Sequence, residues 1–267
     1  MGNLRVLWLW HYLNNKMKKI KFGLKLWSTN IGLIDQAIHL IDEKIFDYIE
    51  LFVIPDTQIS PFMVDVSYII HIPHEKFGVN IGDAIKKEYN LQKIDESIAW
   101  ADRLNARYLI LHAGHGSMKH ATDVLREIAD DRLLIENVPK VGLNDELMIG
   151  YSPAQIEELI GDGDRGLCLD LNHAAKAAVS LGVDYREYVQ DFSVFDPKMF
   201  HISDGTLDNE KDEHLNIGEG DYDFDYLLQC VLGSASGLVT VETPRMHKGS
   251  LNEDIQNVLT LKGTMTV

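Results

Sequence analysis

Cysteine is scarce in this sequence, which has only two among 267 residues, Cys168 and Cys230. Two thiols cannot build the disulfide framework of a small secreted protein, so we expect a reduced protein located in the cytoplasm. Long apolar runs are missing too, because no stretch approaches the ~20 apolar residues that a membrane-spanning helix needs. The sequence therefore predicts no membrane partner.

Positive charge is also in short supply. Lysine and arginine number 25 against 41 aspartates and glutamates, which gives a formal net charge of -16. Because nucleic-acid binding depends largely on lysine and arginine contacts with phosphates, this balance argues against a broad nucleic-acid surface. It leaves open a small, metal-centred site for an anionic substrate. The chain is 45% hydrophobic, enough for one sizeable core, and its length is typical of a single-domain α/β barrel.

The beginning of the chain differs from the rest. The apolar stretch "LRVLWLW" precedes its positive charges, which come in "KMKKIK", whereas a signal peptide has the reverse order. We interpret residues 1–16 as an extension outside the core, either an upstream addition before a natural start at Met17 or a genuine extra arm. Residues 17–267 are then the predicted catalytic domain.

From Lys19 onward, short apolar segments alternate with longer amphipathic ones, a pattern typical of a parallel sheet with crossover helices. The candidate strands are residues 19–27, 48–53, 67–72, 107–112, 132–137, 166–170, 199–203 and 238–242. Helical spacing is clear at 32–44, 94–104 and 152–160, whereas 54–66 has no convincing helix. Eight strands close a barrel, so the predicted fold is a single (β/α)8 TIM barrel.

Potential metal ligands stand at the ends of six successive candidate strands. They are His71, His112, Glu136, Asp170, His201 and Glu242. In a (β/α)8 barrel the active site is built at the carboxyl ends of the strands, where all six fall. Side chains two residues apart share a face of a strand, so His112 shares its face with Ile110 and Asp170 with Cys168. We expect a packed barrel interior beneath a polar mouth.

Three further candidates follow strand ends. His173 comes three residues after Asp170, and "KDEHLNIGEGD" places Asp212 and His214 in the loop after the seventh strand. Side chains separated by one residue on an extended loop point the same way, so Asp212 and His214 can reach one ion together. A lone strand-end histidine or acid is usually structural, but so many clustered together would be costly to bury without cations. The set predicts a divalent-metal site.

The motifs "HIPHEKFGVNIG", "LILHAGH", "LLIENVP", "GLCLDLNHAAKA", "FHISDG", "KDEHLNIGEGD" and "VETP" occur in a characteristic order. Their order and spacing resemble those of the endonuclease IV branch (AP endonuclease family 2) of the xylose isomerase-like TIM barrels. The resemblance covers about residues 19–262.

The resemblance implies a cluster of up to three zinc ions. Its ligands would be His71, His112 and Glu136 for the first ion, Glu136, Asp170, His201 and Glu242 for the second, and His173, Asp212 and His214 for the third. Zinc suits mixed histidine and carboxylate ligands, with manganese or another divalent ion as the alternative. Such a cluster implies phosphoester hydrolysis, in which we expect Glu136, Asp170 and Glu242 to be catalytic.

The loops that would hold DNA depart from the family pattern. "HIPHEKF" has His74 and Glu75 where the resemblance leads one to expect a tyrosine and an apolar wedge, and "IPDTQISPF" lacks the expected asparagine, glutamine, arginine and tryptophan. These departures argue against DNA binding, and the sequence leaves abasic DNA and a small sugar-phosphate-type substrate both open. His74, His115 and Glu50 are the predicted substrate contacts.

The same superfamily contains sugar and sugar-phosphate isomerases and epimerases that use one metal ion. Their ligand set corresponds to Glu136, Asp170, His201 and Glu242, with the two glutamates also carrying protons. Glu50 in "YIELF" resembles this branch too, whereas the third ligand group is superfluous to a single ion. A non-catalytic, metal-stabilised binding barrel is the third hypothesis. The number of bound ions separates the three-ion phosphoesterase from the one-ion isomerase or epimerase. The sequence leaves the oligomeric state open.

Overall fold

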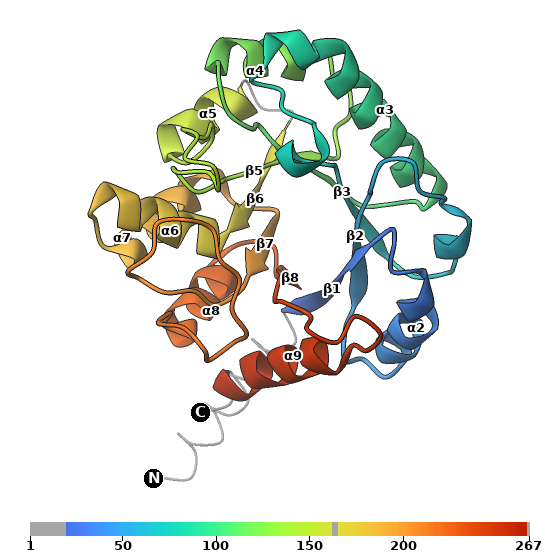
Figure 1. The fold of residues 1–267 in the computed structure, drawn as a ribbon. Helices are drawn as coiled ribbons and strands as arrows, with labels where there is room; N and C mark the ends of the chain where they lie inside the picture. Colours follow the sequence, from blue (N-terminus) through green and yellow to red (C-terminus); the bar gives the residue numbers. More distant parts are fainter. Residues whose placement is uncertain (1–19, 162–164, 266–267) are drawn as a thin grey trace.

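The computed structural model describes residues 20–161 and 165–265, in which eight parallel strands close into a barrel (Figure 1). The strands are β1 (Lys21–Trp27), β2 (Tyr48–Phe52), β3 (Tyr68–His71), β4 (Leu109–His112), β5 (Leu133–Glu136), β6 (Gly166–Asp170), β7 (Met199–Ile202) and β8 (Leu238–Val241). Each strand pairs with the next along the chain, and β8 pairs with β1. The predicted (β/α)8 TIM barrel is confirmed, whereas the predicted extension 1–16 lies outside the described residues.

Helices form a ring around the strands, as Figure 1 shows. They are α2 (Ile34–Asp42), α3 (Lys87–Arg103), α4 (Met118–Leu125), α5 (Pro153–Ile160), α6 (Leu171–Leu181), α7 (Tyr185–Asp191), α8 (Phe224–Gly233) and α9 (Asn252–Thr264). Single 3-10 turns lie at Ile31–Leu33, Ser60–Phe62, Glu75–Phe77, Ala84–Lys86 and Phe192–Phe195. Across the described residues, we find no helix that combines the length and apolar character needed to traverse a bilayer.

The eight predicted strands agree with the structure to within a few residues, as do the predicted helices 32–44 and 152–160. Helix α5 starts as predicted, with Ser152 as its N-cap and Pro153 in its first turn. The prediction for 94–104 missed the first half of α3, which begins at Lys87, because that half is mostly polar and exposed and carries a weak apolar pattern. Between β2 and β3, a stretch that is fully described, the chain forms only the 3-10 turn Ser60–Phe62, as expected for 54–66.

The barrel interior is packed by side chains from successive strands. This inner cluster contains Tyr48, Ile69, Ile110, Leu134, Cys168, Met199 and Leu238. The predicted alternation is therefore correct: Ile110 and Cys168 lie inside, below His112 and Asp170. Gly23 makes room for the Tyr48 ring, since a Cβ at Gly23 would come within 2.2 Å of it. The filled interior leaves the carboxyl ends of the strands as the place for a site.

Strand register then brings the predicted ligands side by side. His112 on β4 is the pairing partner of Glu136 on β5. Asp170 on β6 is likewise the partner of His201 on β7. Glu242 directly follows β8. Ligands that are far apart in sequence thus meet at one end of the barrel.

Candidate metal centre

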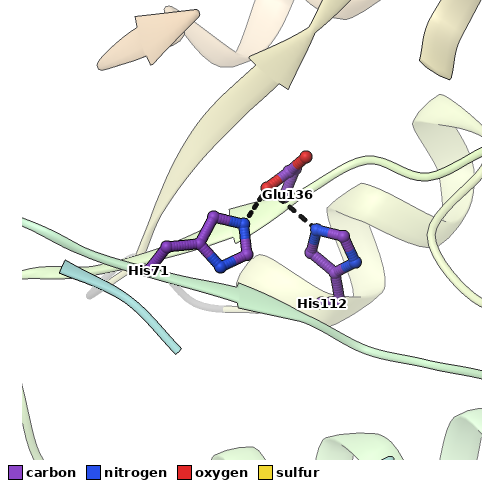
Figure 2. Close-up of side chains that lie close together, drawn as sticks. All are labelled: His71, His112 and Glu136. Carbon is purple, nitrogen blue, oxygen red and sulfur yellow. Dashed lines mark hydrogen bonds and ion pairs between the residues drawn. The ribbon is translucent and has the colours of Figure 1, made fainter. Parts of the chain in front are cut away.

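Glu136 is the centre of the ligand cluster. Its Oε2 atom lies 3.1 Å from Nε2 of His71 and 3.0 Å from Nε2 of His112 (Figure 2). The side chain of Glu136 is only 1% exposed, and ligand atoms of these three residues lie within 4.8 Å of one another. Two imidazole nitrogens converging on one buried carboxylate are suitable ligands for a divalent ion such as zinc.

The other oxygen of Glu136 faces a second group. Its Oε1 atom lies 3.2 Å from Nδ1 of His201. The same nitrogen is 3.7 Å from Oδ2 of Asp170 and 3.2 Å from Oε1 of Glu242. Glu136 therefore stands between two groups of potential ligands, as a bridging carboxylate would.

The third group lies beside the first two. Oδ1 of Asp212 is 3.2 Å from Nε2 of His214 and 3.6 Å from Nε2 of His173. Asp212 and His214 do reach toward the same point from one loop, as their spacing predicted. All nine predicted ligands thus lie in one continuous cluster at the barrel mouth, and their binding of metal stays a prediction.

Hydrogen bonds orient the imidazole rings. The Nδ1–H group of His71 donates to the Ile72 carbonyl and that of His173 to the Asn137 carbonyl, each over 2.9 Å. His214 similarly donates from Nδ1 to the Glu242 carbonyl. Each bond leaves Nε2 free to face the cluster. Metal-binding histidines usually donate their other ring N–H in this way, which fixes the tautomer.

Two buried nitrogens face the cluster without a hydrogen bond. They are Nε2 of His112 and Nδ1 of His201. Buried polar atoms are nearly always satisfied, so each exception needs an explanation. Both nitrogens lie close to Glu136 but are not aligned to donate to it. A cation between these atoms would satisfy them, so the side chains present fit a metal centre.

Asp170 and Asn137 lock the local backbone. Oδ1 of Asp170 accepts the backbone N–H of His173 over 2.7 Å, which caps α6 and leaves Oδ2 for the cluster. The side chain of Asn137 accepts from the Asp170 N–H and donates to the Asp170 carbonyl, joining the ends of β5 and β6. The strand-to-helix turn thus presents Asp170 and His173 together.

Asp204, which sequence reasoning missed, anchors the loop that carries the third group. Its Oδ2 atom accepts the backbone N–H groups of Gly218 and Gly220, each over 2.9 Å. Gly218 has a φ of +92°, so the predicted sharp turn in "GEGD" is present. A Cβ at Gly220 would come within 2.4 Å of Asp204, which explains the second glycine.

Burial and neighbouring charges shift the pKa values of the cluster. Burial raises the pKa of Glu136, but nearby His112 and His201 outweigh it and bring the pKa well below its ordinary value. Burial lowers the pKa of His71 to about 4, so this ring is neutral and keeps a lone pair. For His214 burial acts downward, yet Asp212 raises its pKa to about 9.

A cavity of about 870 Å³ opens over the cluster. Predicted substrate contacts His74 and His115 line it, as do His71, His112 and Glu136. Glu50 does not belong to its lining and is fully buried, bonded to His201 and Thr240. The structure thus places Glu50 beneath the cavity. The expectation that Glu50 contacts substrate is corrected: it supports His201 from below.

Lys25 is the second residue that sequence reasoning missed. Lys25 lies near the carboxyl end of β1, and its Nζ atom is 2.5 Å from Oε1 of Glu50 and 2.5 Å from Oε1 of Glu242. Burial acts to lower the pKa of Lys25, but Glu242 and Glu50 raise it above its ordinary value. The only sequence signal was its spacing: Lys25 is two residues beyond Gly23, on the face that turns into the barrel.

Comparisons with known proteins show the family of the chain. A family model described as xylose isomerase-like TIM barrel matches residues 60–261. The chain is 26% identical to a probable endonuclease 4 from Halothermothrix orenii over 187 residues, which span 60% of this chain and 63% of that protein. The match therefore covers less than two thirds of that relative. The resemblance inferred from the motifs is confirmed.

Two solved structures share the fold. Endonuclease IV from Thermus thermophilus matches with a TM-score of 0.69 and 19% identity, covering 92% of this chain and 98% of that one. A D-tagatose 3-epimerase-like protein matches with a TM-score of 0.72 and 19% identity, covering 92% and 97%. At such identities these likenesses show the fold alone.

Proposed function

The chain belongs to the xylose isomerase-like TIM barrel family, and on that basis we propose that it is a divalent-metal-dependent phosphoesterase with up to three zinc ions. The observation that carries this proposal is the third ligand group. Asp212, His214 and His173 converge beside the Glu136 cluster, and no one-ion site would need them.

The proposed chemistry divides the work between ions and side chains. When bound, the ions would act as Lewis acids and activate water for attack on phosphorus. Glu136, Asp170 and Glu242 hold negative charge at fixed positions around them, and the tied histidine rings keep their free nitrogens aimed inward. The protein supplies preorganised ligands, so little reorganisation is needed during the reaction.

The cavity favours a small, anionic substrate. Lys76, Lys86 and Lys248 line it, but the lining has as many acidic as basic side chains overall, so bound divalent ions would supply the excess positive charge that an anion needs. Its volume of about 870 Å³ suits a sugar phosphate or a similar phosphoester. The net charge of -16 disfavours a long polyanion, so we rank abasic DNA second. Abasic DNA must still be assayed, because a relative of this chain is named probable endonuclease 4.

Metal stoichiometry tests the proposal first. Protein purified without added metal is assayed by elemental analysis, and we expect close to three zinc ions per chain. His214→Ala should lose one of them, whereas the exposed helix residue His120→Ala should lose none. A single ion that persists unchanged in His214→Ala would contradict the three-ion proposal. Hydrolysis of bis-p-nitrophenyl phosphate, sugar phosphates and an abasic oligonucleotide then identifies the substrate class.

A one-ion sugar isomerase or epimerase is the second candidate. It is supported by the compact group around Nδ1 of His201, from which Glu136, Asp170 and Glu242 lie 3.2, 3.7 and 3.2 Å away. Glu136 and Glu242 would exchange protons with the carbon next to the substrate carbonyl. Incubation with ketoses and ketose phosphates in deuterated water should then label that carbon. No label across a broad panel would reject this candidate.

A further inference from the structure

Lys25 brings a positive charge into the predicted ligand cluster. Its ammonium group lies between Oε1 of Glu50 and Oε1 of Glu242, at 2.5 Å from each. Glu242 is a predicted ligand of the second ion, and its Oε1 atom is also 3.2 Å from Nδ1 of His201. Lys25 therefore contacts the same carboxylate oxygen that faces the second ion position.

Glu50 connects Lys25 to the rest of that position. Its Oε1 atom accepts from Lys25, and its Oε2 atom accepts from His201 over 2.9 Å and from Thr240 over 2.6 Å. Glu50 is fully buried, so its charge needs a partner inside the protein. The Lys25–Glu50 pair thus supports both His201 and Glu242.

The ammonium group also faces the cavity. Lys25 lines the cavity together with Trp27 and Phe52, and its side chain is 12% exposed. Its Nζ atom has two carboxylate partners, which leaves one of its three N–H donors for another acceptor. A substrate oxygen bound beside Glu242 is the acceptor that this position offers.

We propose that Lys25 is a resident cation of the metal centre: it shares Glu242 with the second divalent ion, weakens the binding of that ion, and donates to an anionic oxygen of the substrate. This inference rests on the proposed function, because it requires divalent ions at the site. It assigns two opposite effects to one side chain. The charge of Lys25 repels the ion and attracts the substrate anion.

Metal titration tests the first effect. Zinc is titrated into metal-free protein in competition with a chromophoric chelator, for the wild type, Lys25→Met and Lys25→Arg. We expect Lys25→Met to bind its second ion at least about tenfold more tightly, because a cation next to that ion is gone. Lys25→Arg keeps the charge and should stay close to the wild type. The exposed helix variant Lys119→Met controls for loss of a distant positive charge.

Lys25→Met leaves the charge of Glu50 buried without its cation, so this variant could misfold. The same comparison is repeated in protein that carries Glu50→Gln. Glu50→Gln is therefore compared with Lys25→Met/Glu50→Gln, in which that charge is neutral. Removing Lys25 should again tighten the second ion about tenfold. Equal or weaker ion binding without Lys25 in both backgrounds would overturn the inference, because a merely structural lysine gives that result.

Inorganic phosphate binding tests the second effect. With zinc saturating, Lys25→Met should bind phosphate about tenfold more weakly, and Lys25→Arg should restore much of the loss. Unchanged phosphate affinity in Lys25→Met would contradict the proposed contact between Lys25 and the substrate. The two failures are distinguishable: wild-type protein that binds no zinc contradicts the proposed function, whereas zinc-binding wild type with an unaffected Lys25→Met contradicts only the role of Lys25.

Discussion

Glu50 holds His201 in one tautomer. The Nε2–H group of His201 donates to Oε2 of Glu50 over 2.9 Å, so Nδ1 is left facing Glu136 and Glu242. Thr240 donates its only hydroxyl proton to the same Glu50 oxygen over 2.6 Å, and Tyr48 must then donate to Thr240 over 3.0 Å. A chain of buried hydrogen bonds thus runs from the barrel interior to a predicted metal ligand.

Thr240→Val should remove the hydrogen bond that the Thr240 hydroxyl donates to the buried carboxylate of Glu50. The variant keeps the shape of the side chain but removes a donor to a buried carboxylate, so we expect a loss of roughly 1.5–3 kcal/mol in unfolding free energy. Chemical denaturation of the metal-free protein measures it. Tyr48→Phe removes only the bond between two neutral groups and should cost about 1 kcal/mol. Equal losses in the two variants would show that Glu50 does not depend on Thr240.

Asp170→Asn should separate folding from metal binding. Asparagine can still cap α6, and burial already raises the pKa of Asp170, so losing its charge should leave the metal-free protein as stable or more stable. Metal affinity should fall because one carboxylate ligand is lost. Thermal unfolding with and without zinc measures both effects.

Asp170→Ala provides the comparison, since it removes the cap as well and should cost about 1 kcal/mol more. If Asp170→Asn retained the stabilisation that zinc gives to the wild type, Asp170 would not be a ligand.

Asp204→Ala should release the loop that carries Asp212 and His214. The variant loses the acceptor for Gly218 and Gly220, so we expect one zinc ion fewer per chain while the barrel stays folded. Elemental analysis and circular dichroism measure the two outcomes. Asp221→Asn is the matched control, because Asp221 accepts a single N–H in the same loop. A full complement of zinc in Asp204→Ala would mean that the loop is held elsewhere.

Asp130 should make the stability of the protein sensitive to acid at a place away from the proposed metal centre. Its carboxylate accepts three bonds from Arg132, which lower its pKa. A lowered pKa in the folded state stabilises the protein above the unfolded-state value of ~3.9, and this contribution is lost as the pH falls through the folded-state value. Asp130→Asn should therefore cost roughly 1 kcal/mol at neutral pH and nothing at strongly acidic pH.

Denaturation curves over the pH range check this expectation. Asp102 makes a single bond to Arg132 with a side chain that is 64% exposed, so Asp102→Asn should change stability little at any pH. A deficit in Asp130→Asn that persisted unchanged into acid would rule out the charged pair as its cause.

The sequence predicted which residues meet at the carboxyl end of the barrel, because strand periodicity and strand-end chemistry are both local signals. His112 and Glu136 end neighbouring strands, and their pairing followed from strand order alone. Lys25 could not be found this way. Lys21 and Lys25 have the same parity on β1, yet Lys21 is exposed whereas Lys25 enters the mouth. Their exposure differs because Lys21 begins β1 at the far end of the barrel, whereas Lys25 lies near its carboxyl end, and strand periodicity alone does not report this difference.

Supporting residues were harder to predict than the nine residues of the cluster. Glu50 was expected to touch substrate, but its depth depends on the register of β2 against β1, where it pairs with Lys25. Asp204 was missed because its partners, Gly218 and Gly220, are backbone groups of a distant loop. Such contacts have no residue-type signature in sequence.

The position of Glu136 between the ligand groups has a consequence for how the protein would unfold. Ligands from β3 through β8 meet around this one carboxylate, so bound ions would fasten these strands in addition to packing, backbone bonds and a few side-chain bonds such as that of Asn137. The barrel could then open only after ions leave, and the lifetime of the folded chain would follow ion release. A chelator would thus speed proteolysis and abolish the proposed metal-dependent activity together.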